Sequence, residues 1–312
     1  MKFTTFPLNY TTLTLFMILP YVLTQSCKKT CGNIPIKYPF GTGPGCGDPR
    51  FQSYVNCNQE EQLTFITHKG CYPITSIDYN NQILYINDPS MSTCSCSQPS
   101  KGFSLDWNSP FSFHDNTIFA LLDCSISSSS PIYGGGNNNN SSSYYNLCDQ
   151  HGGEICNFLY SCSAISTKIS SSPVSTCCVY TPVNLGPSFE MDLEKLGCSS
   201  YSGLYGFNGQ ETNPSVWKYG VALKYKFNYD NDYPSICANC EKTNGVCGYN
   251  VGGSNSYASF SCNCPNGFNS SDECFSGVYW SYGSRIFPWP QKTGAFLICY
   301  LARIAYEVLF ML

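Results

Sequence analysis

Charged residues are scarce in this chain of 312 residues. Asp, Glu, Lys and Arg together account for 12% of the sequence, and the formal net charge is −4. Binding to nucleic acid requires a basic face that neutralises phosphates, so this balance argues against DNA or RNA as a partner. Aromatic residues nevertheless reach 15%, which is not the composition of a disordered chain.

Residues suited to catalysis are also few. The chain has three histidines, His68, His114 and His151, and none lies in a motif for a nucleophile or a metal site. The neighbouring Glu60 and Glu61 are typical of solvated turn charges, whereas a glycosidase needs two opposed carboxylates in a cleft. We therefore predict a protein that is not an enzyme and that uses no cofactor or metal.

The first 26 residues have the pattern of a secretory signal peptide. Lys2 is the only charge before an apolar run at residues 13–23, and Thr24 and Ser26 are small residues at the expected cleavage positions. The run is too short to span a bilayer. The alternative, a buried N-terminal helix, is disfavoured by the proline and threonines of this stretch. We predict export, with a mature chain that begins near Cys27.

Cysteine, in contrast, is abundant, with 21 residues. In an oxidising compartment cysteines pair with each other rather than bind metal. They fall into three even clusters within residues 27–124, 148–198 and 237–274, and Cys299 stands alone near the end. Spacing does not give the connectivity, and pairing across clusters stays open. The cysteines predicted to form disulfides are Cys27, Cys31, Cys46, Cys57, Cys71, Cys94, Cys96, Cys124, Cys148, Cys156, Cys162, Cys177, Cys178, Cys198, Cys237, Cys240, Cys247, Cys262, Cys264 and Cys274.

Hydrophobic periodicity favours strands over helices. Alternation over residues 221–229 predicts a strand with one packed face. The side chains on that face are Val221, Leu223, Tyr225, Phe227 and Tyr229. Residues 63–67 and 83–86 also have the pattern of strands, and the one tempting internal helix covers residues 188–196. We predict a mostly β, small disulfide-rich fold.

Residues 125–143 are rich in Ser, Gly and Asn and cannot bury enough apolar area to become ordered by themselves. We predict an exposed linker or loop there. Acceptor sequons for N-glycosylation occur at Asn139 and Asn140 in this stretch and at Asn269 farther on. In an exported chain all three are candidate glycosylation sites.

The C-terminal residues 276–312 form a tail whose last part, residues 293–312, is mostly apolar and long enough to cross a bilayer. Arg303 and Glu307 lie within it, and a charge at mid-bilayer is costly. A marginal membrane anchor and an appended tail are therefore both left open.

The N-terminal motifs occur in a recognisable order. Cys31-Gly32 is followed by Tyr38-Pro39-Phe40-Gly41 and by Cys46-Gly47, and Cys71 and Cys94 continue the pattern. This stretch resembles the galacturonan-binding domain of plant wall-associated receptor kinases. The resemblance implies a cysteine-rich extracellular domain at residues 27–124 that binds an acidic cell-wall polysaccharide.

A second set of motifs follows the linker. Cys177-Cys178, a segment beginning at Trp217, and the cysteines from Cys237 onwards resemble the C-terminal module of wall-associated receptors. The ending Cys262-x-Cys264 followed by Gly267 also resembles an EGF-like module. We therefore predict two extracellular modules, at residues 27–124 and 144–275, with an EGF-like C-terminal cysteine cluster. A zinc site at this cluster is the disfavoured alternative.

Such receptors continue into a transmembrane helix and a kinase domain. No Gly-rich nucleotide loop, Val-Ala-Ile-Lys or His-Arg-Asp motif occurs in this chain, which ends at Leu312. We expect a secreted protein of the cell wall, or a plasma-membrane protein with an extracellular face if residues 293–312 span. A receptor kinase partner is a candidate.

The ligand implied by the resemblance carries a carboxylate on every uronic acid unit. Its receptor needs cationic donors and flat aromatic faces. Residues 27–70 hold five basic residues against three acidic ones, a surplus of two positive charges in an acidic chain. The predicted ligand-binding residues are Lys28, Lys29, Lys37, Tyr38, Phe40, Arg50 and Lys69.

Three alternatives remain at this point. The two aromatic side chains are equally suited to anchoring the core, and each basic residue taken alone is an ordinary surface charge. A peptide- or protein-binding ectodomain with no sugar ligand is the rival function. A soluble decoy that competes with full receptors for wall fragments is a variant of the polysaccharide-binding function.

Overall fold

The structure is a computed structural model that describes residues 27–125, 147–148, 152–167, 176–185, 190–250, 258–265, 267 and 269–274. All of these residues belong to one compact unit. The predicted signal peptide, most of the predicted linker with Asn139 and Asn140, and the candidate anchor lie outside the described residues. Within the described ranges every helix falls short of the length and apolar character that a bilayer span requires.

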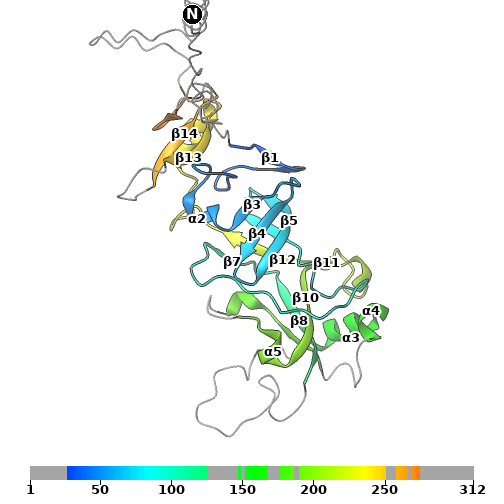
Figure 1. The fold of residues 1–312 in the computed structure, drawn as a ribbon. Coiled ribbons are helices and arrows are strands. Elements are labelled where there is room, and N and C mark those ends of the chain that lie inside the picture. Colours follow the sequence, from blue (N-terminus) through cyan, green and yellow to red (C-terminus); the bar gives the residue numbers. More distant parts are fainter. Residues whose placement is uncertain are drawn as a thin grey trace, which may run out of the picture. The chain divides into compact units, whose positions relative to one another are not determined.

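Strands are the main element of the described residues, and the helices are short (Figure 1). The strands are β1 (Thr30–Cys31), β2 (Ile34–Pro35), β3 (Val55–Cys57), β4 (Leu63–Thr67), β5 (Gly70–Asp78), β6 (Ile83–Ile86), β7 (Phe111–Phe113), β8 (Ile118–Cys124), β9 (Cys178–Tyr180), β10 (Cys198–Gly206), β11 (Lys218–Tyr219), β12 (Val221–Tyr225), β13 (Val246–Asn250), β14 (Ser259–Asn263) and β15 (Asn269–Ser270). The helices are α2 (Pro49–Gln52), α3 (Gly153–Ser161), α4 (Ser163–Ser166), α5 (Leu193–Leu196) and α6 (Ser235–Lys242), with 3-10 turns η3 (Pro182–Asn184) and η4 (Pro214–Val216). The predicted mostly β class is confirmed.

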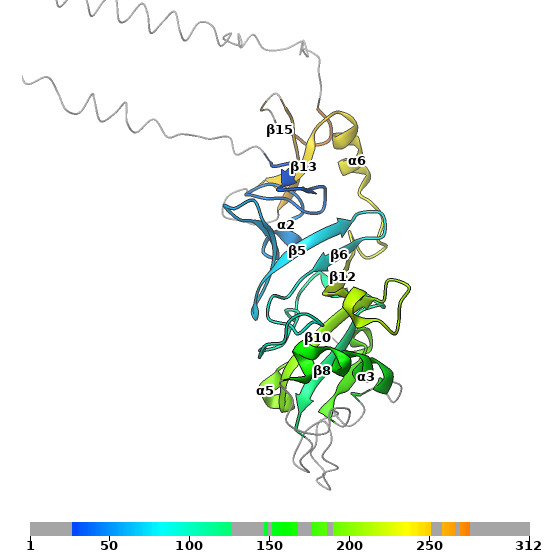
Figure 2. The same ribbon diagram turned by 90° about the vertical axis from the view of Figure 1, so that its right-hand side faces the viewer.

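The largest sheet among the described residues has the strand order β3-β4-β5-β6-β12-β7. β12 comes from late in the chain, yet it pairs antiparallel with β6 on one side and β7 on the other. Figure 2 shows β5, β6 and β12 side by side. Leu223 lies opposite Leu84 in this ladder and is fully buried. The second module therefore supplies an inner strand to the sheet of the first.

The second sheet has the order β11-β10-β8-β9. β8 lies in the predicted first module, whereas the other three strands lie in the second. A disulfide between Cys124 and Cys198 joins β8 to β10 where these residues are opposite each other. The predicted boundary at the linker consequently does not separate the sheets, because long-range strand pairing outweighs proximity in the sequence.

Nine disulfides are present among the described residues. The pairs are Cys27–Cys46, Cys31–Cys57, Cys94–Cys162, Cys124–Cys198, Cys148–Cys178, Cys156–Cys177, Cys237–Cys247, Cys240–Cys262 and Cys264–Cys274. Two of these pairs connect the first cysteine cluster to the second, whereas the third cluster is closed on itself. The predicted disulfide-rich fold with an EGF-like C-terminal cluster is confirmed.

The prediction that all twenty clustered cysteines pair is wrong at two positions. Cys71 and Cys96 are free and exposed. Strand alternation explains the first, because Tyr72 and Ile74 of β5 are buried and the residue before them points to the outer face. Cys96 lies outside the strands in an exposed turn, where the Cys96 amide donates a hydrogen bond to the Thr93 carbonyl.

The predicted strands are confirmed at residues 63–67 and 83–86, which are β4 and β6. The strand predicted over residues 221–229 ends at Tyr225, and Tyr229 is 97% exposed instead of sharing the packed face. The helix predicted over residues 188–196 is reduced to α5. Asp192 caps its start, because the Asp192 side chain accepts a hydrogen bond from the Lys195 amide. Gly197 ends this helix with a left-handed conformation, φ +72°.

The core of the first sheet is built largely from aromatic rings. Phe40 packs edge-to-face against Phe51 and Tyr225, with ring centroids 5.6 and 4.9 Å apart, and stacks with Phe111 at 6.2 Å. Such pairs contribute roughly 0.5–1.5 kcal/mol beyond the burial of their area. These contacts fix the segment that carries the Tyr38-Pro39-Phe40-Gly41 motif onto the sheet.

Candidate functional site

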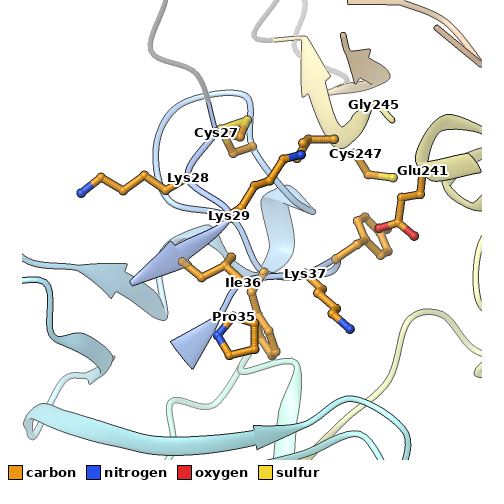
Figure 3. Close-up of a pocket in the computed structure, with 14 residues that line it drawn as sticks. Cys27, Lys28, Lys29, Pro35, Ile36, Lys37, Glu241, Gly245 and Cys247 are labelled. Carbon is orange, nitrogen blue, oxygen red and sulfur yellow. A yellow bond between two sulfur atoms is a disulfide. The ribbon is translucent and has the colours of Figure 1, made fainter. Parts of the chain in front are cut away.

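A pocket of about 230 Å³ lies where the N-terminal segment meets the C-terminal cysteine cluster (Figure 3). Its lining residues are Cys27, Lys28, Lys29, Pro35, Ile36, Lys37, Tyr38, Phe40, Gly41, Cys46, Glu241, Gly245, Val246 and Cys247. Five of the seven predicted ligand-binding residues are in this set. The structure thus brings Lys28, Lys29, Lys37, Tyr38 and Phe40 together from the sequence motifs.

Local covalent and steric constraints shape the N-terminal wall of the pocket. The disulfides Cys27–Cys46 and Cys31–Cys57 hold the strands β1 and β2 and the loop that follows them. Gly41 is required in this loop because a Cβ atom there would lie 2.3 Å from the backbone carbon of Cys46. The cysteines and the glycine of the motif therefore fix the path of the backbone, and the lysine side chains lie at the surface.

Tyr38 forms one side of the pocket and is anchored from behind. Its hydroxyl donates to the Asp48 carboxylate over 3.1 Å. Its ring stacks with Phe227 at 6.1 Å and meets Tyr233 edge-on at 5.8 Å. Burial raises the pKa of the Tyr38 phenol well above its ordinary value, and the nearby carboxylate adds to the effect. The ring remains partly exposed, so it is fixed in place and still accessible from the pocket.

The prediction that Phe40 offers a stacking face is wrong. The side chain is 3% exposed, and the core rings described above cover it. The alternative weighed for this residue, a core anchor, is the role that the structure gives it.

The three pocket lysines have no acidic partner among the described residues. Lys28, Lys29 and Lys37 are exposed, and none makes an ion pair with a described residue. The Lys37 ammonium lies 5.6 Å from the centre of the Tyr79 ring, and the Lys37 amide donates to the Tyr79 hydroxyl over 3.0 Å. Figure 3 shows Lys28 pointing away from Lys29 and Lys37. Their charges are thus available to an anion.

The other two predicted basic residues lie outside the pocket lining and already have partners. Arg50 Nη2 is 2.7 Å from the Asp48 carboxylate and also donates to the Phe227 carbonyl. Lys69 Nζ is 2.6 Å from the Glu190 carboxylate. The Arg50–Asp48 pair joins two charges that already cancel in the surplus, whereas the Lys69–Glu190 pair neutralises a charge that the surplus counted as free.

The opposite wall comes from α6 and β13. The Glu241 carboxylate points from α6 toward the N-terminal segment (Figure 3), and it accepts a hydrogen bond of 2.8 Å from the Tyr233 hydroxyl. With three lysines and one glutamate, the lining carries a net charge of two positive. Sequence reasoning missed Glu241, because no local pattern joins it to a segment some two hundred residues earlier.

Backbone contacts hold the two walls together. The Gly47 amide donates to the Cys247 carbonyl over 2.9 Å, and the Tyr249 amide donates to the Gly45 carbonyl over 3.0 Å. Gly248 fits between them because a Cβ atom there would lie 1.9 Å from the Gly45 oxygen. The C-terminal cluster is therefore part of the same site.

The cysteine sulfurs beside the pocket meet the spacing of a metal site but are not available to a metal. Two groups, Cys262 with Cys264 and Cys274, and Cys237 with Glu241 and Cys247, bring their candidate ligand atoms within 4.8 Å of one another. Each of these cysteines is in a disulfide. Zinc binding requires thiolates, so these groups serve as cross-links.

The N-terminal motifs match a described protein domain. Residues 27–88 match the domain described as "Wall-associated receptor kinase galacturonan-binding". Wall-associated receptor kinase-like 20 of Arabidopsis thaliana is 26% identical over 196 residues, which cover 60% of this chain and 26% of that protein. Wall-associated receptor kinase 2 of the same plant is 37% identical over 60 residues, which cover 19% of this chain and 8% of that protein. Wall-associated receptor kinase-like 15, also from this plant, is 30% identical over 125 residues, which cover 38% of this chain and 19% of that protein.

The N-terminal part of the chain is homologous to wall-associated receptor kinases. It spans at most 26% of the length of these three relatives. No solved structure matches it. The similarity supports a cell-wall receptor ectodomain as the kind of protein to which this chain corresponds.

The pocket extends beyond the matched domain. All seven predicted ligand-binding residues fall within residues 27–88. Glu241 and the β13 wall lie outside that range. In this wall-associated receptor kinase homologue, a site at the matched domain therefore includes residues that the domain itself does not contain.

Proposed function

We propose that this protein binds acidic pectin, a galacturonan of the plant cell wall, through the pocket at Lys28, Lys29 and Lys37, without catalysis. The observation that carries the proposal is a pocket lined by three lysines that make no ion pair with a described residue, beside the fixed ring of Tyr38. All four residues belong to the segment that matches a galacturonan-binding domain.

The pocket has the chemistry of a uronate site. Lysine ammonium groups attract and hydrogen-bond carboxylates, and an aromatic face accepts the apolar side of a sugar ring. Its volume of about 230 Å³ is below the roughly 300–1,000 Å³ of a pocket for a drug-sized ligand. A single sugar unit suits this volume, with neighbouring units of the polymer lying on the surface.

Binding of the full chain to immobilised de-esterified homogalacturonan tests the proposal, with fully methyl-esterified pectin and neutral xyloglucan as controls. We expect retention on the acidic polymer alone, weakening from about 50 mM to about 500 mM salt because exposed charges are screened. Equal or absent retention on all three polymers would contradict the proposal and favour a peptide or protein partner.

A lysine-neutralised variant makes the test specific. Replacing Lys28, Lys29 and Lys37 by Gln removes three exposed contacts of about 0.2–1 kcal/mol each, and we expect binding to weaken roughly threefold to 100-fold. The matched control replaces the exposed lysines Lys101, Lys218 and Lys226, which lie outside the pocket lining. If both variants weaken binding equally, net charge rather than this pocket holds the polymer.

The proposed location follows from the proposed ligand. Nine disulfides among the described residues are typical of an oxidising, extracellular compartment, and the cell wall is where a pectin ligand is found. The candidate sites Asn139, Asn140 and Asn269 stay proposals for glycosylation, of which Asn269 is exposed on β15. A receptor kinase partner, a membrane anchor at residues 293–312 and a soluble decoy form also remain proposals.

A further inference from the structure

A second pocket, of about 200 Å³, lies where β8 ends and β10 begins. Asp123 and Ser199 are among the residues that line it. Each is the neighbour of a cysteine in the Cys124–Cys198 disulfide, which joins the two strands at this point. This pocket shares no lining residue with the pocket of the proposed function.

Asp123 is the one charged residue in the described lining of this second pocket. Its Oδ2 accepts a hydrogen bond of 2.9 Å from the Ser199 hydroxyl. It forms no ion pair with a residue of the described ranges. A charge that is partly removed from water is costly unless a partner compensates it, so this carboxylate favours a cation supplied by a ligand.

The backbone around this carboxylate is held in an uncommon conformation. Asp123 has a left-handed φ of +52°, which Asp and Asn adopt more readily than other residues that have a side chain. Its amide donates to the Tyr160 hydroxyl over 3.3 Å. The carboxylate is therefore anchored twice, through the backbone to Tyr160 and through its own Oδ2 to Ser199.

The rest of the pocket is suited to an aliphatic chain. Leu122 and Ile165 are 2% and 1% exposed and belong to one hydrophobic cluster, and Pro99 is an exposed residue of the lining. Long basic side chains place their methylene groups against apolar surface and keep the charge at a polar group. The lining offers both surfaces within one pocket.

The acceptors beside these apolar walls favour a guanidinium group. A carboxylate accepts two parallel hydrogen bonds from the planar fork of arginine. The Ser199 oxygen keeps its own lone pairs while its hydrogen is donated to Asp123. A galacturonan is repelled by the same carboxylate, and a neutral sugar leaves its charge uncompensated.

We propose that the pocket at Asp123 and Ser199 binds an arginine side chain of a peptide or protein partner. The guanidinium pairs with the Asp123 carboxylate, and the methylene groups lie against Leu122 and Ile165. The inference does not rest on the proposed function, because the two pockets share no lining residue. It gives the chain a second recognition site of opposite charge.

Saturation-transfer NMR on the full chain tests the site with three capped tripeptides, acetyl-Gly-X-Gly-amide, in which X is arginine, lysine or citrulline. Citrulline keeps the shape of arginine and lacks its charge. We expect the arginine peptide to bind with a dissociation constant of about 1 mM. The citrulline peptide should bind roughly tenfold more weakly, and the lysine peptide should lie between them because its ammonium lacks the planar fork.

Asp123→Asn locates the binding, because asparagine keeps the shape of the side chain and tolerates the left-handed backbone. The variant should reduce binding of the arginine peptide to the level of the citrulline peptide. The matched control is Asp230→Asn, which changes the net charge equally at an exposed residue outside this lining. It should leave the preference for arginine intact.

Three results would overturn the proposal. The first is equal binding of the arginine and citrulline peptides to the unmodified chain, a measurement that needs no variant. The second is an equal loss of arginine binding in Asp123→Asn and Asp230→Asn, because net charge then explains it. The third is saturable binding of a neutral xyloglucan oligosaccharide that Asp123→Asn removes, without binding of the arginine peptide, because the pocket is then a sugar site.

Discussion

Gly248→Ala should separate the two walls of the pocket. A methyl group at this position would lie 1.9 Å from the Gly45 carbonyl oxygen and 2.5 Å from the Asn263 amide nitrogen. The first of these atoms belongs to the backbone, so the strand β13 must move to make room. The move would break the hydrogen bonds Gly47 N to Cys247 O and Tyr249 N to Gly45 O, which measure 2.9 and 3.0 Å.

The size of the effect follows from these contacts. Overpacking costs about 1–3 kcal/mol, and two lost hydrogen bonds cost about 1 kcal/mol each. We therefore expect the free energy of unfolding to fall by about 3–5 kcal/mol, if the two bonds break completely.

Urea unfolding without reductant measures this change while the disulfides stay intact. Gly153→Ala is the matched control, because its added Cβ atom meets nothing within 4 Å and alanine suits the start of a helix. A loss below about 0.5 kcal/mol for Gly248→Ala, within the range of ordinary surface substitutions, would refute the close docking of β13 on the Gly45 loop.

Two further predictions concern the ion pair and the free thiols. The Lys69 ammonium lowers the pKa of the Glu190 carboxyl, so the pair stabilises the fold above the ordinary pKa range of Glu and loses its effect as the pH falls through the lowered pKa. Lys69→Met should therefore reduce the free energy of unfolding by about 0.2–1 kcal/mol at about pH 7 and leave it unchanged near about pH 2.5. An equal loss at both pH values in urea unfolding would contradict the pairing. Alkylation without reductant should label the peptides of Cys71 and Cys96 and leave the nine disulfide pairs unlabelled, whereas a peptide linking Cys71 to Cys96 would show that the two are joined.

Sequence periodicity predicted the parts of the fold in which burial alternates along one strand. β4 and β6 have the expected bounds because their buried residues recur on one face. Helices α3 and α6 were missed because cysteines supply part of their buried faces: Cys156 with Leu159 in α3, and Cys237 with Cys240 in α6. These residues have helical spacing, but we interpreted them only as cross-links.

The pairing of distant segments had no local signal. β12 enters the first sheet between β6 and β7, and Cys94 pairs with Cys162 across the predicted modules. Such contacts depend on which surfaces fit each other in three dimensions, and one sequence without relatives does not specify them. The same reason explains why Glu241 could not be placed opposite the lysines.

Two of the five basic residues predicted to bind the ligand lie outside the pocket lining and are paired with carboxylates. Arg50 follows Asp48 and Pro49, a pattern typical of a helix start whose capping carboxylate is within reach of the arginine. That local signal was present in the sequence and gave a reason to exclude Arg50. Lys69 had no comparable signal, because Glu190 reaches it from a distant segment.

The most direct test of the central claim is retention of the full chain on de-esterified homogalacturonan, measured against its Lys28, Lys29 and Lys37 variant and the matched surface-lysine variant. We predict salt-sensitive retention that is roughly threefold to 100-fold weaker in the pocket variant and nearly unchanged in the surface variant. Equal retention of all three proteins, or retention on neutral xyloglucan, would contradict acidic pectin recognition at this pocket.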